Sequence, residues 1–300
     1  MRTLTIIMIS YNPKDWARFI LGFPKSDTFR KLLPWLIIIG VYAWGIAYLE
    51  LHHFKLSQDN NLKNVSLLHS LLGFAISMLL VFRTNTAYDR WWEGRRQWGA
   101  LVNSSRNLAI KLNGLLPQDD EKNRSFFIQL IPRFALELKH HLQSEATRLS
   151  LDEKPHSEIP DFDRSKHVPN QVASLIMNRI FLLQRQKQLT SEQLLILNNE
   201  ASSFIEICGA CERIKNTPIP FSYSSFIKKF IFLYIITLPI GYVFSLGYLI
   251  IPVVIFVFYV LGSLEMIAEE IEDPFGNDLN DLPMQRMYEN IKRNVAEILA

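Results

Sequence analysis

Three long runs without a charged side chain dominate the pattern of hydrophobic and polar positions along the chain. The first two runs, residues 32–49 and 64–82, approach the roughly 20 residues that an apolar helix needs to cross a bilayer. A buried helix of a soluble protein is the alternative. The charged flanks and aromatic ends of both runs favour two transmembrane helices instead.

The third run, residues 230–264, is too long for one crossing, because a straight helix of about 35 residues would be about 50 Å long. The residues that interrupt it are Pro239, Gly241, Gly247 and Pro252. We therefore predict two spans, residues 230–248 and 250–264, joined by a very tight turn. Breaks of this kind are tolerated where protein protects the backbone or where it lines a watery cavity.

The distribution of lysine and arginine sets the orientation of the four predicted spans. Segment 1–31 is rich in both, whereas the loop between the first two spans carries only Lys55 and Lys63. The positive-inside rule therefore places both termini of a multi-pass protein in the cytoplasm. The middle segment 83–229 and the C-terminal segment 265–300 are then cytoplasmic as well.

Apolar residues recur at helical spacing through most of the middle segment, where glycine and proline are sparse. The predicted helices cover residues 91–116, 123–142, 171–188 and 192–214, with a charged, proline-containing loop at 150–170. An acidic stretch follows the last span, and a short helix covers residues 283–300. The predicted fold is all-α, with four transmembrane helices continuous with a large helical cytoplasmic region.

Composition supports the same division. Hydrophobic residues make up 49% of the 300 and charged residues 20%, which fits a membrane part joined to a sizeable water-exposed part. The net charge of +3 is too small to suggest a nucleic-acid partner. Cys208 and Cys211 form a C-x2-C pair without the second ligand pair of a structural zinc site, so we interpret them as buried packing thiols. No phosphate-binding loop, nucleophile elbow or catalytic dyad is found, so we expect neither an enzyme nor a cofactor.

Phe74, Met78 and Phe82 lie four residues apart in the second run and share roughly one face of the predicted helix. Packed around a symmetry axis, such a face would form stacked hydrophobic rings, which can gate ions by dewetting. On spacing alone, an ordinary packing or lipid-facing stripe is favoured. His69 lies in the same run, but a neutral histidine near a helix end costs little, so a structural role is favoured for it too.

Candidate metal ligands are sparse in the sequence. The adjacent pairs His52-His53 and His140-His141 have no carboxylate spaced to complete a site, so we expect no metal there. The acidic stretch after the last span offers oxygen ligands for a hard cation, but a solvated acidic helix is favoured. Its members are Glu265, Glu269, Glu270, Glu272, Asp273, Asp278 and Asp281.

Four segments of the chain resemble the bestrophin family of membrane ion channels. The two specific ones are LLVFRTNTAYDRWWEGRRQWG at residues 79–99 and DPFGNDLNDLP at 273–283; WARFI at 16–20 and TPIPFSYS at 217–224 support them. The form of the first segment is closest to the bacterial and plant branches. The resemblance implies a funnel-shaped homopentamer with four spans per subunit and a helical cytoplasmic part.

The resemblance also implies two constrictions in the ion path. A hydrophobic neck would fall on Phe74, Met78 and Phe82, although Val81 replaces a glycine of the family pattern. A second constriction at the cytoplasmic exit is usually apolar in the family, and its counterpart here is near Glu192. A ring of carboxylates there would favour cations. Equally, Glu192 is an ordinary residue for a helix start.

Animal members of the family bind calcium through the segment equivalent to residues 273–281. Asp273, Asp278 and Asp281 are present here, but Leu279 and Asn280 interrupt the acidic run, so we expect no calcium control. The overall expectation is a passive, cation-selective channel in the bacterial inner membrane, with lipid, permeant ions and further copies of the chain as partners. An anion channel of the same fold is the alternative. A secondary transporter and a membrane scaffold rank lower.

Overall fold

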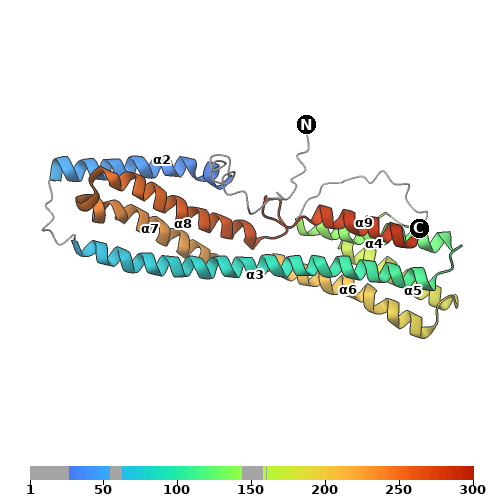
Figure 1. Cartoon of the computed structure of the whole chain (residues 1–300). Helices are drawn as coiled ribbons and strands as arrows, with labels where there is room; N and C mark the ends of the chain where they lie inside the picture. The colour runs from blue at the N-terminus through green and yellow to red at the C-terminus, as the bar shows by residue number, and fades with distance from the viewer. Residues whose placement is uncertain (1–26, 55–62, 144–157, 160) are drawn as a thin grey trace. The chain divides into compact units, whose positions relative to one another are not determined.

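The computed structural model describes residues 27–54, 63–143, 158–159 and 161–300. Every regular element in these ranges is helical, so the all-α fold expected from the sequence is confirmed. The elements in chain order are α2 (Asp27–Tyr48), the π-helical η2 (Leu49–Phe54), α3 (Lys63–Leu115), α4 (Glu121–Gln143), α5 (Val168–Arg185), α6 (Ser191–Asn216), α7 (Phe221–Leu246), the 3-10 turn η3 (Gly247–Leu249), α8 (Ile250–Glu272) and α9 (Met284–Leu299) (Figure 1).

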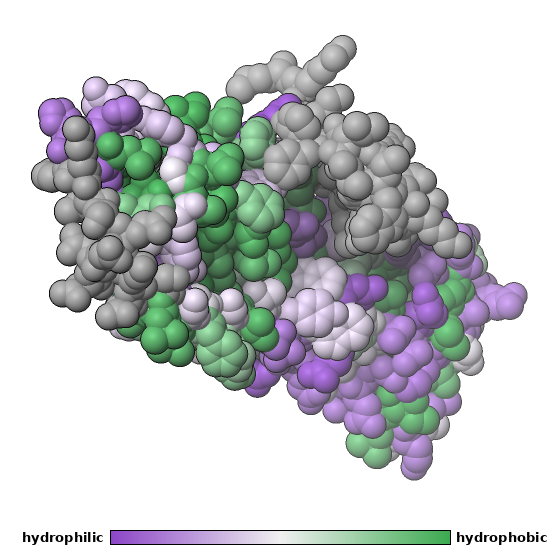
Figure 2. All heavy atoms as spheres, turned by 60° about the vertical axis from the view of Figure 1, so that its left-hand side comes forward, coloured by the Kyte–Doolittle hydropathy of each residue, from purple (hydrophilic) through white to green (hydrophobic). Residues whose placement is uncertain are grey.

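The chain divides into two compact units, which we name by their surfaces. Of the described residues, the apolar unit comprises 27–54, 63–89 and Ile219–Glu272; the polar unit comprises 90–143, 158–159, 161–218 and Asp273–Ala300. Helix α3 contributes residues to both units. Figure 2 shows the corresponding segregation of hydrophobic and hydrophilic side chains on one face of the molecule.

Helices α2, α7 and α8 and the first part of α3 form the apolar unit. α7 and α8 run side by side as a hairpin, and α2 packs along α8 (Figure 1). The hairpin turns at Gly247, whose φ of 54° lies in the left-handed region that favours glycine. The buried core of this unit consists of Ile39, Ala43, Ala47, Ile76, Leu80, Ile227, Ile231, Ile235, Leu238, Val243, Ile250 and Val254.

The outer surface of the apolar unit is itself hydrophobic, with Trp35, Ile37, Trp44, Phe232 and Phe256 all exposed. Three helical stretches are long and apolar enough to cross a membrane: Thr28–His53, Leu67–Leu115 and Phe221–Glu272. The third stretch contains both α7 and α8. The division into four spans, with boundaries at residues 32–49, 64–82, 230–248 and 250–264, stays a prediction.

The polar unit is built on α4, which packs against α9 and α5, while α5 packs against α6. Its core includes Trp98, Phe127, Phe134 and Phe204, all fully buried. Cys208 and Cys211 are buried in this core as well. Burial, assisted by the negative charge of Glu212, raises the pKa of the Cys208 thiol to about 12. Both cysteines therefore pack as small apolar side chains.

A buried carboxylate lies on α4 and is surrounded by cations. Glu137 is almost inaccessible, and its oxygens lie 2.7 Å from Arg133, 2.6 Å from Arg164 and 3.8 Å from His140. Burial alone would raise the pKa of Glu137. The hydrogen bonds from Arg164 and the proximity of His140 and Arg133 outweigh burial and hold the pKa at about 2.

We predict that Glu137→Gln lowers the stability of the protein at neutral pH. Because the folded-state pKa of Glu137 lies below its unfolded value of about 4.3, the stabilisation is fully present above about pH 4.3 and is lost toward pH 2. The contribution is roughly 3 kcal/mol at most. Thermal unfolding followed by circular dichroism between pH 7 and pH 2 measures it.

The matched control is Glu206→Gln, an exposed position on α6, which should follow the wild type at every pH. In contrast, the unfolding midpoint of Glu137→Gln should be lower at pH 7 and should change less than the wild type's below pH 4.3. Superimposable curves for Glu137→Gln and the wild type would show that the buried ion cluster contributes nothing.

Candidate functional site

Three apolar side chains of α3 project together from the surface of the apolar unit. Phe74, Met78 and Phe82 are 69%, 43% and 57% exposed. Between them, Ile76 and Leu80 point the other way and are buried in the core. We call Phe74, Met78 and Phe82 the α3 stripe. In a single chain this stripe has no covering partner among the described residues, which makes it available to lipid, to another copy of the chain or to a pore.

Local hydrogen bonds satisfy the polar groups that interleave with the α3 stripe. Ser77 donates to the carbonyl of Gly73 (2.8 Å), and Thr84 donates to that of Leu80 (2.8 Å). Such back-bonds let hydroxyl groups lie in an apolar helix without exposing an unpaired donor, and they tend to bend it. Gly73 also admits a neighbour: a Cβ there would lie 3.0 Å from the Tyr234 hydroxyl of α7.

His69 lies inside the apolar unit, where it is buried. Its Nε2 is 3.0 Å from the hydroxyl of Thr237 on α7, and its ring contacts those of Tyr234 and Tyr242. The histidine is thus a packed and hydrogen-bonded core residue. It does not belong to the exposed α3 stripe, in agreement with the structural role favoured from the sequence.

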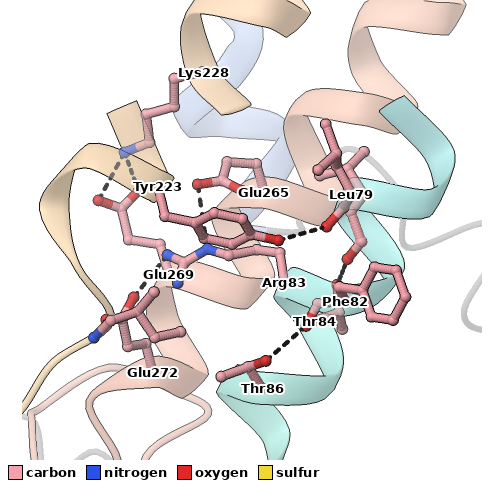
Figure 3. A network of polar contacts seen from close by, with 12 residues as sticks. Leu79, Phe82, Arg83, Thr84, Thr86, Tyr223, Lys228, Glu265, Glu269 and Glu272 are labelled. Atoms are coloured by element: carbon pink, nitrogen blue, oxygen red, sulfur yellow. Dashed lines mark hydrogen bonds and ion pairs between the residues drawn. The ribbon is translucent and has the colours of Figure 1, made fainter. Parts of the chain in front are cut away.

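Arg83 follows Phe82 directly and is only 1% exposed. Its Nη2 pairs with Glu272 Oε2 at 2.7 Å, and its Nε lies 3.7 Å from Glu265 Oε1 (Figure 3). The other oxygen of Glu272 accepts a hydrogen bond from the backbone N–H of Ile219 at 2.7 Å. One carboxylate at the end of α8 therefore ties α3 to the segment that leads into α7.

The same end of the apolar unit carries a second, exposed ion pair. Lys228 on α7 donates to both oxygens of Glu269 at 2.9 Å. Glu265, Glu269 and Glu272 lie at i, i+4 and i+7, so they share one face of α8. We interpreted them from the sequence as part of a solvated acidic stretch. That interpretation is wrong for Glu265, which is buried beside Arg83; the i, i+4, i+7 spacing was the available signal.

Contacts inside the polar unit bring together the two specific segments that carry the family resemblance, residues 79–99 and 273–283. Arg90 donates to the carbonyls of Ile214 (2.6 Å) and Thr217, which lie at the end of α6. The indole N–H of Trp91 donates to the carbonyl of Asn280 at 2.9 Å.

A Cβ on Gly94 would lie 3.1 Å from Pro274 and 3.2 Å from Phe275. Segment 79–99 thus meets segment 273–283 and, through Arg90, the first residues of segment 217–224. The fourth segment, 16–20, lies outside the described residues.

Glu192 is the second residue of α6 and is exposed. It follows the N-cap residue Thr190, which forms a capping box with Gln193. Hydrogen bonds from the Thr190 hydroxyl and from its own backbone lower the pKa of Glu192, so its carboxylate is charged at neutral pH. Glu192 is thus an acidic residue in the first turn of a helix, where its negative charge interacts favourably with the helix dipole.

Two of the three aspartates after α8, Asp273 and Asp281, accept hydrogen bonds from nearby backbone N–H groups. Asp273 accepts from Phe275 at 3.3 Å, and buried Asp281 accepts from Asp278. Gly276 lies so close to Asp281 that a Cβ there would be 2.7 Å from its Oδ2. These side chains stabilise the turn between α8 and α9, and Asp273, Asp278 and Asp281 are not gathered into a group that could hold a metal ion.

A group with metal-ligand chemistry does occur elsewhere in the described part of the polar unit. The ligand atoms of His141, His167 and Glu212 all lie within 4.8 Å of one another. The expectation that His141 has no carboxylate partner is therefore wrong. Sequence spacing could not reveal the partnership, because Glu212 follows His141 by 71 positions.

An all-helical fold with long apolar helices and a hydrophobic outer surface defines an integral membrane protein. The chain matches the family described as Bacterial/Fungal Bestrophin protein over residues 8–297. It belongs to the bestrophin family and is an ion channel protein of that family.

Relatives and solved structures agree with this assignment. A protein of Nostoc sp. is 37% identical over 230 residues, 75% of each chain, and one of Escherichia coli K12 is 32% identical over 94% of this chain and 86% of the relative. Both carry the name voltage-dependent anion channel-forming protein. Crystal structures of a bacterial bestrophin homologue from Klebsiella pneumoniae match with TM-scores of 0.77 and 0.75 at 28% identity, covering 90% and 88% of this chain and 99% and 97% of the solved chains.

We predict that Arg83→Ala destabilises the protein by about 3 kcal/mol or more, because it leaves buried Glu265 and half-buried Glu272 without their cation. Lys228→Ala is the matched control: it removes a cation from the same end of the unit, but from an exposed pair worth about 1 kcal/mol or less. Thermal unfolding in detergent, followed by tryptophan fluorescence, compares the two. Equal, small losses would mean that Arg83 does not hold the helices together.

Proposed function

We propose that the chain assembles into a homopentameric, passive ion channel whose narrowest hydrophobic segment is lined by the α3 stripe, Phe74, Met78 and Phe82. The observation that supports it is the exposure of three large apolar side chains on consecutive turns of one helix. Four residues advance a helix by about 6 Å, so symmetric copies of α3 would stack three apolar rings over about 12 Å. A constriction of this kind excludes water and ions until it widens.

Arg83 supports this assignment by fixing the rotation of α3. It lies one residue beyond the stripe but on the buried side of the helix, paired with α8. Rotating α3 until the stripe faced the core of the apolar unit would pull the Arg83 guanidinium away from its carboxylates. Separating a buried charge from its partners carries a large energetic penalty. The same argument makes the stripe a stable surface for assembly around an axis.

The proposed setting is the bacterial inner membrane, with four spans per subunit and both termini in the cytoplasm. The positive-inside pattern and the apolar outer surface of α2, α7 and α8 support it. Lipid contacts that surface, and the permeant ion crosses the α3 stripe before it enters a vestibule formed by the polar units. No step of the proposal requires a cofactor or a catalytic residue.

For the permeant ion, we propose a monovalent cation. The supporting observation is the charged, exposed carboxylate of Glu192 near the position where the family has its exit constriction. A ring of five carboxylates would concentrate cations and repel anions. An anion channel is the second candidate, favoured by the names of the relatives from Nostoc and Escherichia coli.

We predict that replacing Phe74, Met78 and Phe82 together by alanine increases the conductance or the open probability of reconstituted channels, because the apolar constriction widens. Single-channel recording in planar bilayers measures both. Ile37→Ala, a change to an exposed apolar residue of α2, is the control and should leave the current unaltered. Wild-type currents from the triple variant would refute the assignment of the neck.

We further predict that the reversal potential under a KCl gradient lies near the potassium equilibrium potential for the wild type and moves toward zero in Glu192→Gln. Glu206→Gln, which removes an exposed carboxylate from the same helix, should behave as the wild type. A wild-type reversal potential near that of chloride would establish the anion candidate and remove Glu192 as selector. Absence of any current from verified proteoliposomes would contradict the channel itself.

A further inference from the structure

We propose that His141, His167 and Glu212 form a site for a divalent transition-metal ion, with Zn²⁺ as the ion that fits best. The three residues come from different elements of the polar unit: His141 from the end of α4, His167 from the N-cap of α5 and Glu212 from the last turns of α6. The Nε2 atoms of the two rings lie 2.6 Å and 2.5 Å from the same atom, Glu212 Oε1. The ring centroids are 4.4 Å apart.

The donor set matches the coordination chemistry of zinc. Two imidazole nitrogens and one carboxylate oxygen are the protein ligands of sites that leave a fourth position to water. In a tetrahedral site with bonds near 2.0–2.1 Å, ligand atoms are about 3.3 Å apart. The two Nε2–Oε1 distances would therefore each have to increase by somewhat less than about 1 Å. His141 is exposed, and the other two side chains are half-buried, so small side-chain rotations suffice.

The tautomer of the His167 ring must change when the metal binds. The backbone N–H of Asn170 donates to Nδ1 of His167 at 3.2 Å, so in a neutral ring the proton is on Nε2, where it is donated to Glu212. Coordination through Nε2 needs the proton on Nδ1 instead. The number of protons on the neutral ring is unchanged, but the cap on the first turn of α5 is lost. Metal binding and capping by His167 are therefore mutually exclusive.

The surroundings allow an ion to enter and also limit its affinity. His167 lines an open surface hollow together with Asp161, Lys166 and Asn170, which gives access from solvent. Lys215 donates to the backbone carbonyl of His141 at 3.3 Å, so a positive charge lies near the site. The carboxylate of Glu212 offsets this charge. We therefore expect binding in the micromolar range or tighter, with one ion per chain linking α4, α5 and α6.

The test uses the full-length protein, purified in detergent without a histidine tag and stripped with a chelator. Zn²⁺ is titrated against a competing indicator dye, and Co²⁺ is added in parallel, because tetrahedral or five-coordinate Co²⁺ absorbs visible light strongly. We expect one ion per wild-type chain, with affinity at least tenfold lower and the Co²⁺ band lost in His141→Ala and Glu212→Gln.

Two further sets of variants separate metal binding from folding. His167→Asn keeps a favoured N-cap residue while removing the metal ligand, so its unfolding midpoint without metal should stay near that of the wild type, and Zn²⁺ should no longer raise it. Glu206→Gln, which removes an exposed carboxylate of α6 that is not a ligand, and His53→Ala, an exposed histidine outside the polar unit, should bind as the wild type. Wild-type affinity in His141→Ala and Glu212→Gln, or no micromolar binding to the wild type, would overturn the proposal.

Discussion

The organisation of the apolar unit depends on a single constraint, the burial of the Arg83 guanidinium. A charge withdrawn from water is tolerated only when opposite charges and hydrogen-bond acceptors replace its hydration. Here the acceptors come from α8, and one of them also binds the backbone before α7. The Nε and Nη1 atoms of Arg83 and both oxygens of Glu265 have no hydrogen-bond partner, so the balance rests on the pairing with Glu272 and on proximity of charge. Any displacement of α3 against α8 is therefore opposed by electrostatics as well as by packing.

Local signals in the sequence were sufficient for the helices and for the hairpin turn. An uncharged run of about 20 residues can pair all of its backbone groups within itself only as a helix, and a bilayer offers no other partners for them. The excess length of the third run, with its glycines and prolines, predicted a tight turn between residues 248 and 250; in the structure the turn is Gly247–Leu249. The continuity of α3 from Lys63 to Leu115 has the same origin: neither proline nor a helix-breaking glycine pair occurs between the apolar run and the charged segment.

Pairings between distant positions could not be predicted, and these define the chemistry of the molecule. Arg83 counted from the sequence as a flanking charge, and its burial became visible only when α3 was placed beside α8. The contact between Trp91 and Asn280 joins residues 189 positions apart. The possible metal ligands could not be predicted either, because Glu212 of α6 lies beside His141 and His167 only in the folded chain. Spacing identified Phe74, Met78 and Phe82 as one helix face but favoured a packing role for it; the neck role was assigned from the family resemblance and stays a prediction.

The two cysteines have a practical consequence for mapping the ion path. Cys208 and Cys211 are the only cysteines in the chain, and both are buried with thiols held in the protonated, unreactive form. The native protein therefore already suits labelling experiments, because neither of its own thiols should react with a water-soluble reagent. Single cysteines introduced along α3 would be the only sites open to water-soluble methanethiosulfonate reagents, and the rate of modification at each position would trace which side of the helix contacts water.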